Sequence, residues 1–237
     1  MLIILVIAIV ALVSAGTWFF YACTAPGSKF FRPVLVSGSV QGRVIALTFD
    51  DGPASPFTEQ ILDILRSKKV PATFFVCGQN VERYPEITHR IAREGHILGN
   101  HTFSHPFLFF RSNRFMAEEI DRAQGAIEKA SGFRPTVFRP PYGIRWPGLL
   151  GVLRTRGMKL IMWSATGYDW KLQADGIVKS ALENLSPGAV LLLHDGHELN
   201  PAAKIDRSGT IKALPKIIDL ARAEGFEFVP LGEFLGT

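Results

Sequence analysis

The sequence has few cysteines: Cys23 and Cys77 are the only two among 237 residues. A disulfide-rich scaffold is therefore excluded, and a chain of this length buries an adequate core without one. Intrinsic disorder is excluded as well, because 47% of the residues are hydrophobic. The net charge of +5 is not gathered into any block of five or six basic residues. We therefore expect no nucleic-acid partner.

Charged residues are absent before Lys29. Residues 1–23 are almost entirely apolar, and at 1.5 Å per residue a helix of this length reaches roughly 34 Å, enough to cross a bilayer core. The pattern predicts an N-terminal transmembrane anchor over residues 1–23. A linker over residues 24–42 and one domain over residues 43–237 complete the predicted organisation.

Two alternatives to an uncleaved anchor stay open. A cleaved signal peptide is disfavoured because the apolar run is long, has no basic start and lacks a clean Ala-x-Ala site. Lipidation at Cys23 is the other alternative. Ala22 is suitably small for such processing, but Phe20 and Tyr21 are bulky for it.

From Val44 onward, short β-branched or aliphatic runs alternate with helical patterns. Such alternation predicts repeated βα units and a parallel sheet, either open or closed into a barrel. The predicted strands span residues 44–50, 72–76, 97–100, 159–163, 189–194 and 227–230. The predicted helices span residues 57–69, 85–94, 114–130, 146–156, 175–185 and 211–224.

Polar residues with catalytic chemistry follow the predicted strands. The first strand runs into Asp50 and Asp51, the third leads to His101 and His105, and a later one delivers His194. In parallel α/β folds, active sites are built at the carboxyl ends of the strands. The sequence therefore predicts one site at this edge.

His101 and His105 have i, i+4 spacing. On a helical turn this spacing places both imidazoles on one face, where they can hold a divalent metal. A carboxylate from Asp50 or Asp51 would complete a set of two histidines and one carboxylate. An isolated pair of histidines is more often structural, but two adjacent carboxylates repel each other unless a cation separates their roles.

Two further groups of residues have catalytic potential. In Arg139-Pro140-Pro141-Tyr142, the two prolines can hold the arginine and the tyrosine backbone in fixed directions. Asp169 is a candidate partner of His194, since a carboxylate on one ring nitrogen leaves the other free to deliver a proton.

These segments, in this order, resemble the polysaccharide deacetylase family, the carbohydrate esterases that share the NodB homology domain. The resemblance covers residues 43–234, nearly the whole predicted soluble part. The matching motifs are Thr48-Phe49-Asp50-Asp51-Gly52-Pro53, His101-Thr102-Phe103-Ser104-His105, Arg139-Pro140-Pro141-Tyr142, Asp169-Trp170 and Leu192-Leu193-His194.

The resemblance implies a distorted (β/α) barrel that removes acetyl groups from N-acetylated polysaccharide and releases acetate. It implies a divalent metal held by Asp51, His101 and His105. Zinc suits one carboxylate with two histidines, and cobalt or nickel fits the same ligands.

The resemblance also implies roles for the remaining motif residues. Asp50 is the expected general base, and Arg139 is expected to orient it. The backbone N–H of Tyr142 is expected to stabilise the oxyanion. His194, tethered by Asp169, is expected to protonate the departing amine. The residues expected to contact substrate are Tyr142, Trp170 and Leu192.

Substrate and location are less sharply indicated. Peptidoglycan N-acetylglucosamine or N-acetylmuramic residues are the leading substrates, followed by chitin-like oligomers, because an anchored glycan deacetylase would face a polysaccharide outside the membrane. Against this, Lys29, Arg32 and Arg43 follow the apolar run, and this favours a cytoplasmic domain. A deacylase of another acetylated glycan or amide, and a non-catalytic carbohydrate-binding relative, are the alternative functions.

Overall fold

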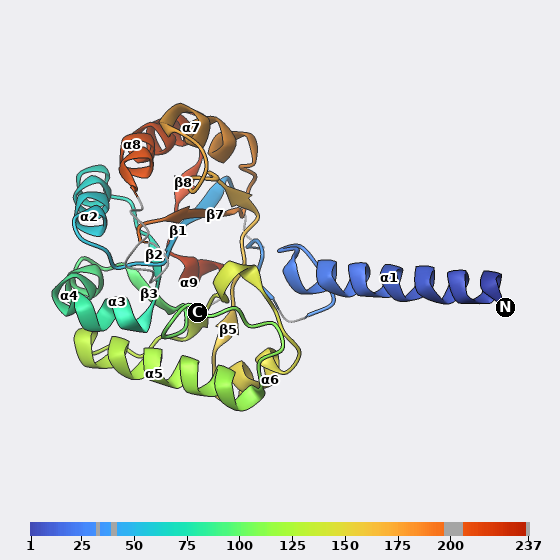
Figure 1. Cartoon of the computed structure of the whole chain (residues 1–237). Helices are drawn as coiled ribbons and strands as arrows, with labels where there is room; N and C mark the ends of the chain where they lie inside the picture. Colours follow the sequence, from blue (N-terminus) through green and yellow to red (C-terminus); the bar gives the residue numbers. More distant parts are fainter. Residues whose placement is uncertain (32–33, 39–41, 197–205, 236–237) are drawn as a thin grey trace.

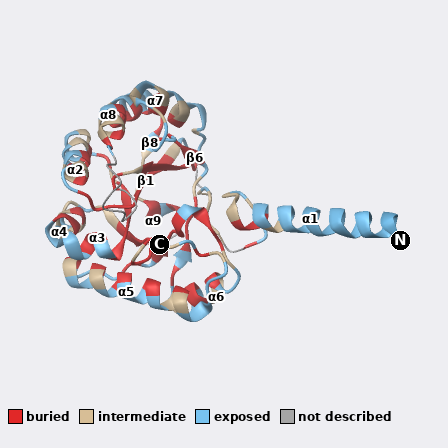
Figure 2. Cartoon of the chain, in the orientation of Figure 1, coloured by how far each residue is buried: buried red, intermediate tan, exposed pale blue. Residues whose placement is uncertain are grey.

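The structure is a computed structural model that describes residues 1–31, 34–38, 42–196 and 206–235. Arg32, one of the basic residues considered for membrane orientation, lies outside the described residues. Figure 1 shows a curled sheet wrapped by helices, with one long N-terminal helix projecting from it. That helix is α1, Leu2–Thr24, and most of its length is exposed (Figure 2).

The described residues form an eight-stranded sheet in which all the paired strands run parallel. Along the sheet the order is β5-β4-β3-β2-β1-β7-β6, and β8 pairs with β1 beside this path. The strands are β1 (Val44–Asp50), β2 (Thr73–Val76), β3 (Ile97–Asn100), β4 (Val137–Phe138), β5 (Lys159–Leu160), β6 (Ala165–Thr166), β7 (Val190–His194) and β8 (Glu227–Phe228). The fold is the distorted (β/α) barrel that the family resemblance implies.

Helices cover the outer face of the sheet, as Figure 1 shows. The helices after α1 are α2 (Phe57–Lys68), α3 (Gly78–Arg83), α4 (Pro85–Arg93), α5 (Asn113–Ser131), α6 (Leu149–Arg154), α7 (Ala174–Glu183), α8 (Ser208–Ala223) and α9 (Leu231–Phe234), with a 3₁₀ turn η1 at Pro141–Gly143. The exception to the outer position is α9, whose Leu231 and Phe234 pack on the inner side of the sheet. The largest core cluster joins β1, β2 and β7 to α2, α4, α7 and α8. Each of these helices buries its apolar face against the sheet.

The predicted element boundaries differ from the structure by one to three residues at most elements, and β4, β6, α3 and α9 were not predicted. Two of these differences have a visible cause. The strand expected over residues 159–163 ends at Leu160, because the carbonyls of Ile161 and Met162 accept hydrogen bonds from a buried arginine, Arg139. The helix expected from residue 146 begins at Leu149 instead. Gly148 before it has φ +91°, a left-handed conformation that favours glycine.

The segment predicted as a linker contacts the domain. Leu35 bridges to Ile161 in parallel, and Ser37 bridges to Ala189 in antiparallel fashion. The first contact lies beside β5 and the second beside β7. The described part of this segment therefore packs on the sheet rather than standing away from it.

Candidate active site

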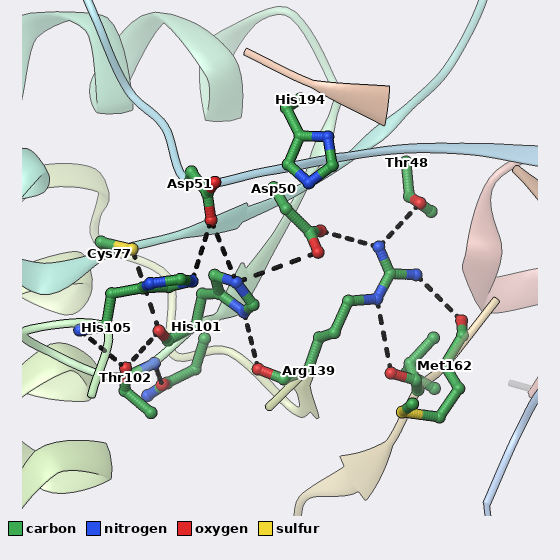
Figure 3. Close-up of polar contacts among 12 residues, drawn as sticks. Thr48, Asp50, Asp51, Cys77, His101, Thr102, His105, Arg139, Met162 and His194 are labelled. Atoms are coloured by element: carbon green, nitrogen blue, oxygen red, sulfur yellow. Dashed lines mark hydrogen bonds and ion pairs between the residues drawn. The ribbon is translucent and has the colours of Figure 1, made fainter. Parts of the chain in front are cut away.

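Strand register brings the predicted polar residues to one edge of the sheet. In β1, Asp50 lies opposite His194 of β7 and Phe75 of β2. β3 ends at Asn100, so His101 leaves the sheet at the same edge. Asp51 follows β1 with φ +75°, and this turn directs its side chain towards the histidines (Figure 3).

Asp51, His101 and His105 form a compact buried cluster. The Asp51 Oδ1 atom lies 3.3 Å from His101 Nε2 and 3.1 Å from His105 Nε2. One potential ligand atom from each residue lies within 4.8 Å of the others. The structure thus selects Asp51, rather than Asp50, as the carboxylate closest to both imidazoles.

The two histidines converge, but the helical turn expected to align them is absent. They lie in a loop in which Thr102 has φ +67° and His105 has φ +52°. These left-handed residues turn the chain so that both rings face Asp51, with ring centroids 4.9 Å apart. The i, i+4 spacing indicated the correct pair for the wrong geometric reason.

A neighbouring helix holds this loop in place. The carboxylate of Glu119 in α5 accepts hydrogen bonds from the backbone N–H groups of Phe103 and Ser104 and from the Ser104 hydroxyl. Asn100 accepts a bond from the Thr102 N–H and donates to the carbonyl of Ile120. α5 therefore carries the scaffold for a loop whose own backbone is strained.

The donor set fits a divalent cation. His101 Nδ1 lies 2.7 Å from the carbonyl oxygen of Arg139, so it must carry the hydrogen. When the His101 ring is neutral, its Nε2 atom therefore presents a lone pair to the Asp51 carboxylate. A cation bound between these two electron-rich groups would stabilise them. Burial opposes ionisation of Asp51, but His105 and His101 hold its pKa well below the ordinary value. A negative ligand and imidazole nitrogens are therefore preorganised together.

Arg139 is fully buried and holds Asp50. Its Nη1 atom donates to Asp50 Oδ1 at 2.7 Å and to the Thr48 hydroxyl at 2.8 Å. Its Nη2 atom donates to the carbonyl of Met162 at 2.9 Å. Burial lowers the pKa of Arg139, and Asp50 offsets part of that fall. One oxygen of Asp50 is thus fixed, while Oδ2 lies 3.9 Å from His101 Nε2.

His194 and Asp169 form a second acid–base pair. Asp169 Oδ1 lies 2.8 Å from His194 Nδ1, and Oδ2 accepts bonds from the His194 backbone N–H and the Thr210 hydroxyl. Burial lowers the pKa of His194, but Asp169 outweighs it, and the net result raises the pKa to about 9. His194 is therefore protonated at neutral pH, with Nε2 free of the Asp169 contact.

A cavity of about 390 Å³ unites these groups. Its lining residues are Asp50, Asp51, His101, His105, Tyr142, Gly143, Trp163, Trp170, Leu192, His194 and Arg207. Tyr142, Trp170 and Leu192 were predicted to contact substrate, and all three line this cavity. Trp170 meets the His194 ring edge-on at 5.3 Å, and Phe107 stacks on Tyr142 at 4.2 Å.

Sequence reasoning missed several residues that shape the cavity. Gly143, Trp163 and Arg207 line it, and Thr210 holds Asp169 from α8. The only usable signal was the position of Gly143 just after the Arg139–Tyr142 motif. Asp195 was also missed as a buried group: burial raises its pKa to about 7, a Thr58 hydrogen bond opposes the rise, and Asp51 adds to it.

Comparison with known proteins agrees with this geometry. The family model for polysaccharide deacetylase matches residues 37–161, more than half of the chain. The chain belongs to the polysaccharide deacetylase family. It is therefore a hydrolase of the class that cleaves acetyl groups from polysaccharides.

Curated deacetylases match this family member over most of its length. A peptidoglycan-N-acetylglucosamine deacetylase of Bacillus cereus is 38% identical over 202 residues, which cover 85% of this chain and 71% of the relative. A chitooligosaccharide deacetylase of a Bradyrhizobium species is 38% identical over 201 residues, covering 82% and 92%. The crystal structure of the Bc1960 peptidoglycan N-acetylglucosamine deacetylase superposes with a TM-score of 0.79 at 37% identity, covering 85% and 92%.

Proposed function

We propose that this chain is a membrane-anchored deacetylase that removes N-acetyl groups from peptidoglycan amino sugars, with chitin-like oligomers as secondary substrates. The observation that carries the proposal is the convergence of three groups on one cavity: the Asp51, His101 and His105 cluster, the Arg139-held Asp50 and the Asp169-held His194. Relatives with similar sequences are named for both glycans.

Each pair of residues has a distinct part in hydrolysis. Asp50 removes a proton from the attacking water, and the hydrogen bond from Arg139 holds the Asp50 carboxylate in position. A bond forms between the water oxygen and the acetamide carbon, and the backbone N–H of Tyr142 stabilises the resulting oxyanion. His194 then donates its proton to the sugar nitrogen as the carbon–nitrogen bond breaks. The products are acetate and a free amine.

Asp51, His101 and His105 would hold a divalent metal, which we propose to be zinc, with cobalt and nickel as alternatives. When bound, this metal supplies Lewis acidity to the acetamide carbonyl and lowers the pKa of water. Trp170 and Leu192 contribute apolar surface to the cavity, where the acetyl methyl would lie.

The anchor proposal rests on α1 and its contacts. This helix has 23 residues and a window of mean hydropathy 2.6. Hydrogen bonds from the buried Arg145 hold the end of this helix against the domain. The Arg145 guanidinium donates to the carbonyls of Ala22 and Ser28. The Arg145 backbone N–H donates to the carbonyl of Cys23. Cleavage before Cys23 would remove one acceptor of this buried cation, the Ala22 carbonyl, and this favours an uncleaved anchor over signal processing or lipidation.

We place the catalytic domain outside the membrane because its proposed substrates lie there. The basic flank formed by Lys29 and Arg43 argues for the opposite side. A carboxyl-terminal alkaline phosphatase fusion should be active if the domain is external. A fusion active only with a cytoplasmic reporter would overturn the placement.

Substrate preference can be tested with the purified full chain in detergent, loaded with zinc. We expect faster acetate release from peptidoglycan than from N-acetylglucosamine oligomers, and none from O-acetylated xylan. Release from acetylated xylan alone would support the alternative deacylase. No release from any glycan, together with no metal bound, would support a carbohydrate-binding protein.

A further inference from the structure

Aromatic side chains gather where α1 meets the catalytic domain. Phe20 of α1 stacks on Phe109 with centroids 5.8 Å apart, and Phe19 meets Trp146 edge-on at 5.9 Å. Phe110 packs against Trp146 at 4.8 Å. We call this group the aromatic collar; its members are Trp18, Phe19, Phe20, Phe30, Phe109, Phe110 and Trp146.

Much of the collar remains exposed although it joins two parts of the chain. Phe110 is 86% exposed, Phe20 is 59% exposed and Trp18 is 56% exposed. Burial inside the protein therefore does not account for these side chains. A contiguous group of exposed aromatic residues of this kind indicates a surface that meets an apolar partner.

Arg145 fixes the end of α1 beside the collar. Its side chain is fully buried, and its guanidinium donates to the carbonyls of the residues that end α1 and follow it. These acceptors are Ala22, Ala25, Pro26 and Ser28. An arginine with several backbone acceptors holds a segment in one orientation. The end of α1 is thus held against the domain by hydrogen bonds.

The position and charge of the collar point to lipid as its partner. Trp18, Phe19 and Phe20 lie in the last two turns of a helix long enough to span a bilayer, the level at which aromatic side chains meet the membrane interface. Exposed Lys29 and Arg111 flank the collar. The sequence has no acidic residue before Asp50 that would repel anionic lipid headgroups.

We propose that the aromatic collar binds the surface of the membrane that α1 crosses and so holds the catalytic domain against that membrane. We call this contact between the collar and the lipid the seat. This inference rests on the proposed anchor and adds a fixed orientation to it. The seat adjoins the active site, because Tyr142 of the cavity wall stacks on Phe107, which lies two residues before Phe109 of the collar. The enzyme would then act on acetylated sugars within one domain diameter of the lipid, roughly 40 Å.

Fluorescent labelling of the full chain tests the seat. Phe110→Cys carries an environment-sensitive nitrobenzoxadiazole label, and Phe133→Cys is the matched control. Both native side chains are aromatic and mostly exposed, so neither substitution disturbs the core. The two positions flank α5, whose 19 residues span about 28 Å. Cys23 and Cys77 are fully buried, so the parent chain controls for background labelling.

The labelled chains are reconstituted into phosphatidylcholine–phosphatidylglycerol vesicles that contain nitroxide-bearing lipid. We expect blue-shifted emission at position 110 and quenching several-fold stronger there than at position 133. Equal, water-like emission at both positions in vesicles that carry the chain on flotation would overturn the seat and leave the anchor intact. Failure of the chain to float with the vesicles would refute the anchor, and the seat with it.

Discussion

Replacement of Asp169 by asparagine removes one negative charge from a buried pair while preserving side-chain shape. The carboxylate is fully buried and lies 2.8 Å from His194 Nδ1. Because burial alone lowers the pKa of His194, the rise from 6.5 to about 9 depends on this neighbour above all. Asparagine should therefore return the pKa of His194 at least to its ordinary value.

The size of the effect follows from the two pKa values. At pH 8, a histidine with a pKa of about 9 is about 90% protonated, whereas one with a pKa of 6.5 is about 3% protonated. If His194 must be protonated to release the amine, kcat/KM at pH 8 should fall roughly thirtyfold relative to the parent enzyme. At pH 5.5 both forms are mostly protonated, so the ratio should approach unity.

The assay is acetate release from N-acetylglucosamine oligomers between pH 5.5 and 9, with each variant divided by the parent at the same pH. Asp175→Asn is the matched control, since Asp175 is 90% exposed and pairs with Lys216 at the surface. A loss that is the same at every pH would refute the reasoning. An equally large loss when Asp169→Asn is added to His194→Asn would also refute it, because Asp169 would then act independently of the histidine.

Three further predictions concern metal binding, pH and backbone space. His101→Ala should lose both the bound metal and turnover. Asp50→Asn should lose turnover but keep the metal, as measured by elemental analysis. Loss of metal in Asp50→Asn and its retention in His101→Ala would contradict the assigned roles. In the metal-free protein, the raised pKa of His194 stabilises the fold fully below pH 6.5, and this stabilisation is lost as pH rises through about 9. The advantage of the parent over His194→Gln in urea unfolding should thus shrink by about 3 kcal/mol between pH 6 and 10, and an unchanged difference would disprove the link. Gly52→Ala should lower the free energy of unfolding by about 2 kcal/mol, because the added Cβ would overlap the buried carboxylate of Asp195. Gly125→Ala lies on the open side of α5 and should raise the free energy of unfolding by up to about 1 kcal/mol. Equal unfolding midpoints for the two variants would contradict this prediction.

Local patterns were sufficient to predict the framework. The first and third strands were predicted with their observed bounds, since β1 and β3 are short aliphatic runs bounded by polar residues. Parallel strands bring their carboxyl ends together, so Asp50, His101 and His194 were expected at one edge before any distance was known. Register then placed Asp50 opposite His194.

Features that depend on tertiary contacts were not predictable. α3 follows β2 in a segment that begins with glycine and is soon followed by proline, so its sequence carries no helical period. The left-handed residues that aim His101 and His105 depend on Glu119, a residue outside every motif. Arg145 stood in a predicted loop, and its role at the end of α1 emerges only when distant segments meet.

The most direct test of the account is acetate release by the full chain after chelation and reloading with zinc, measured beside Asp50→Asn under the same conditions. We predict that release from peptidoglycan disappears on chelation, returns with zinc in the parent, and remains absent in Asp50→Asn although that variant binds zinc. Release that survives complete removal of metal, or that persists in Asp50→Asn, would contradict the assignment of this site.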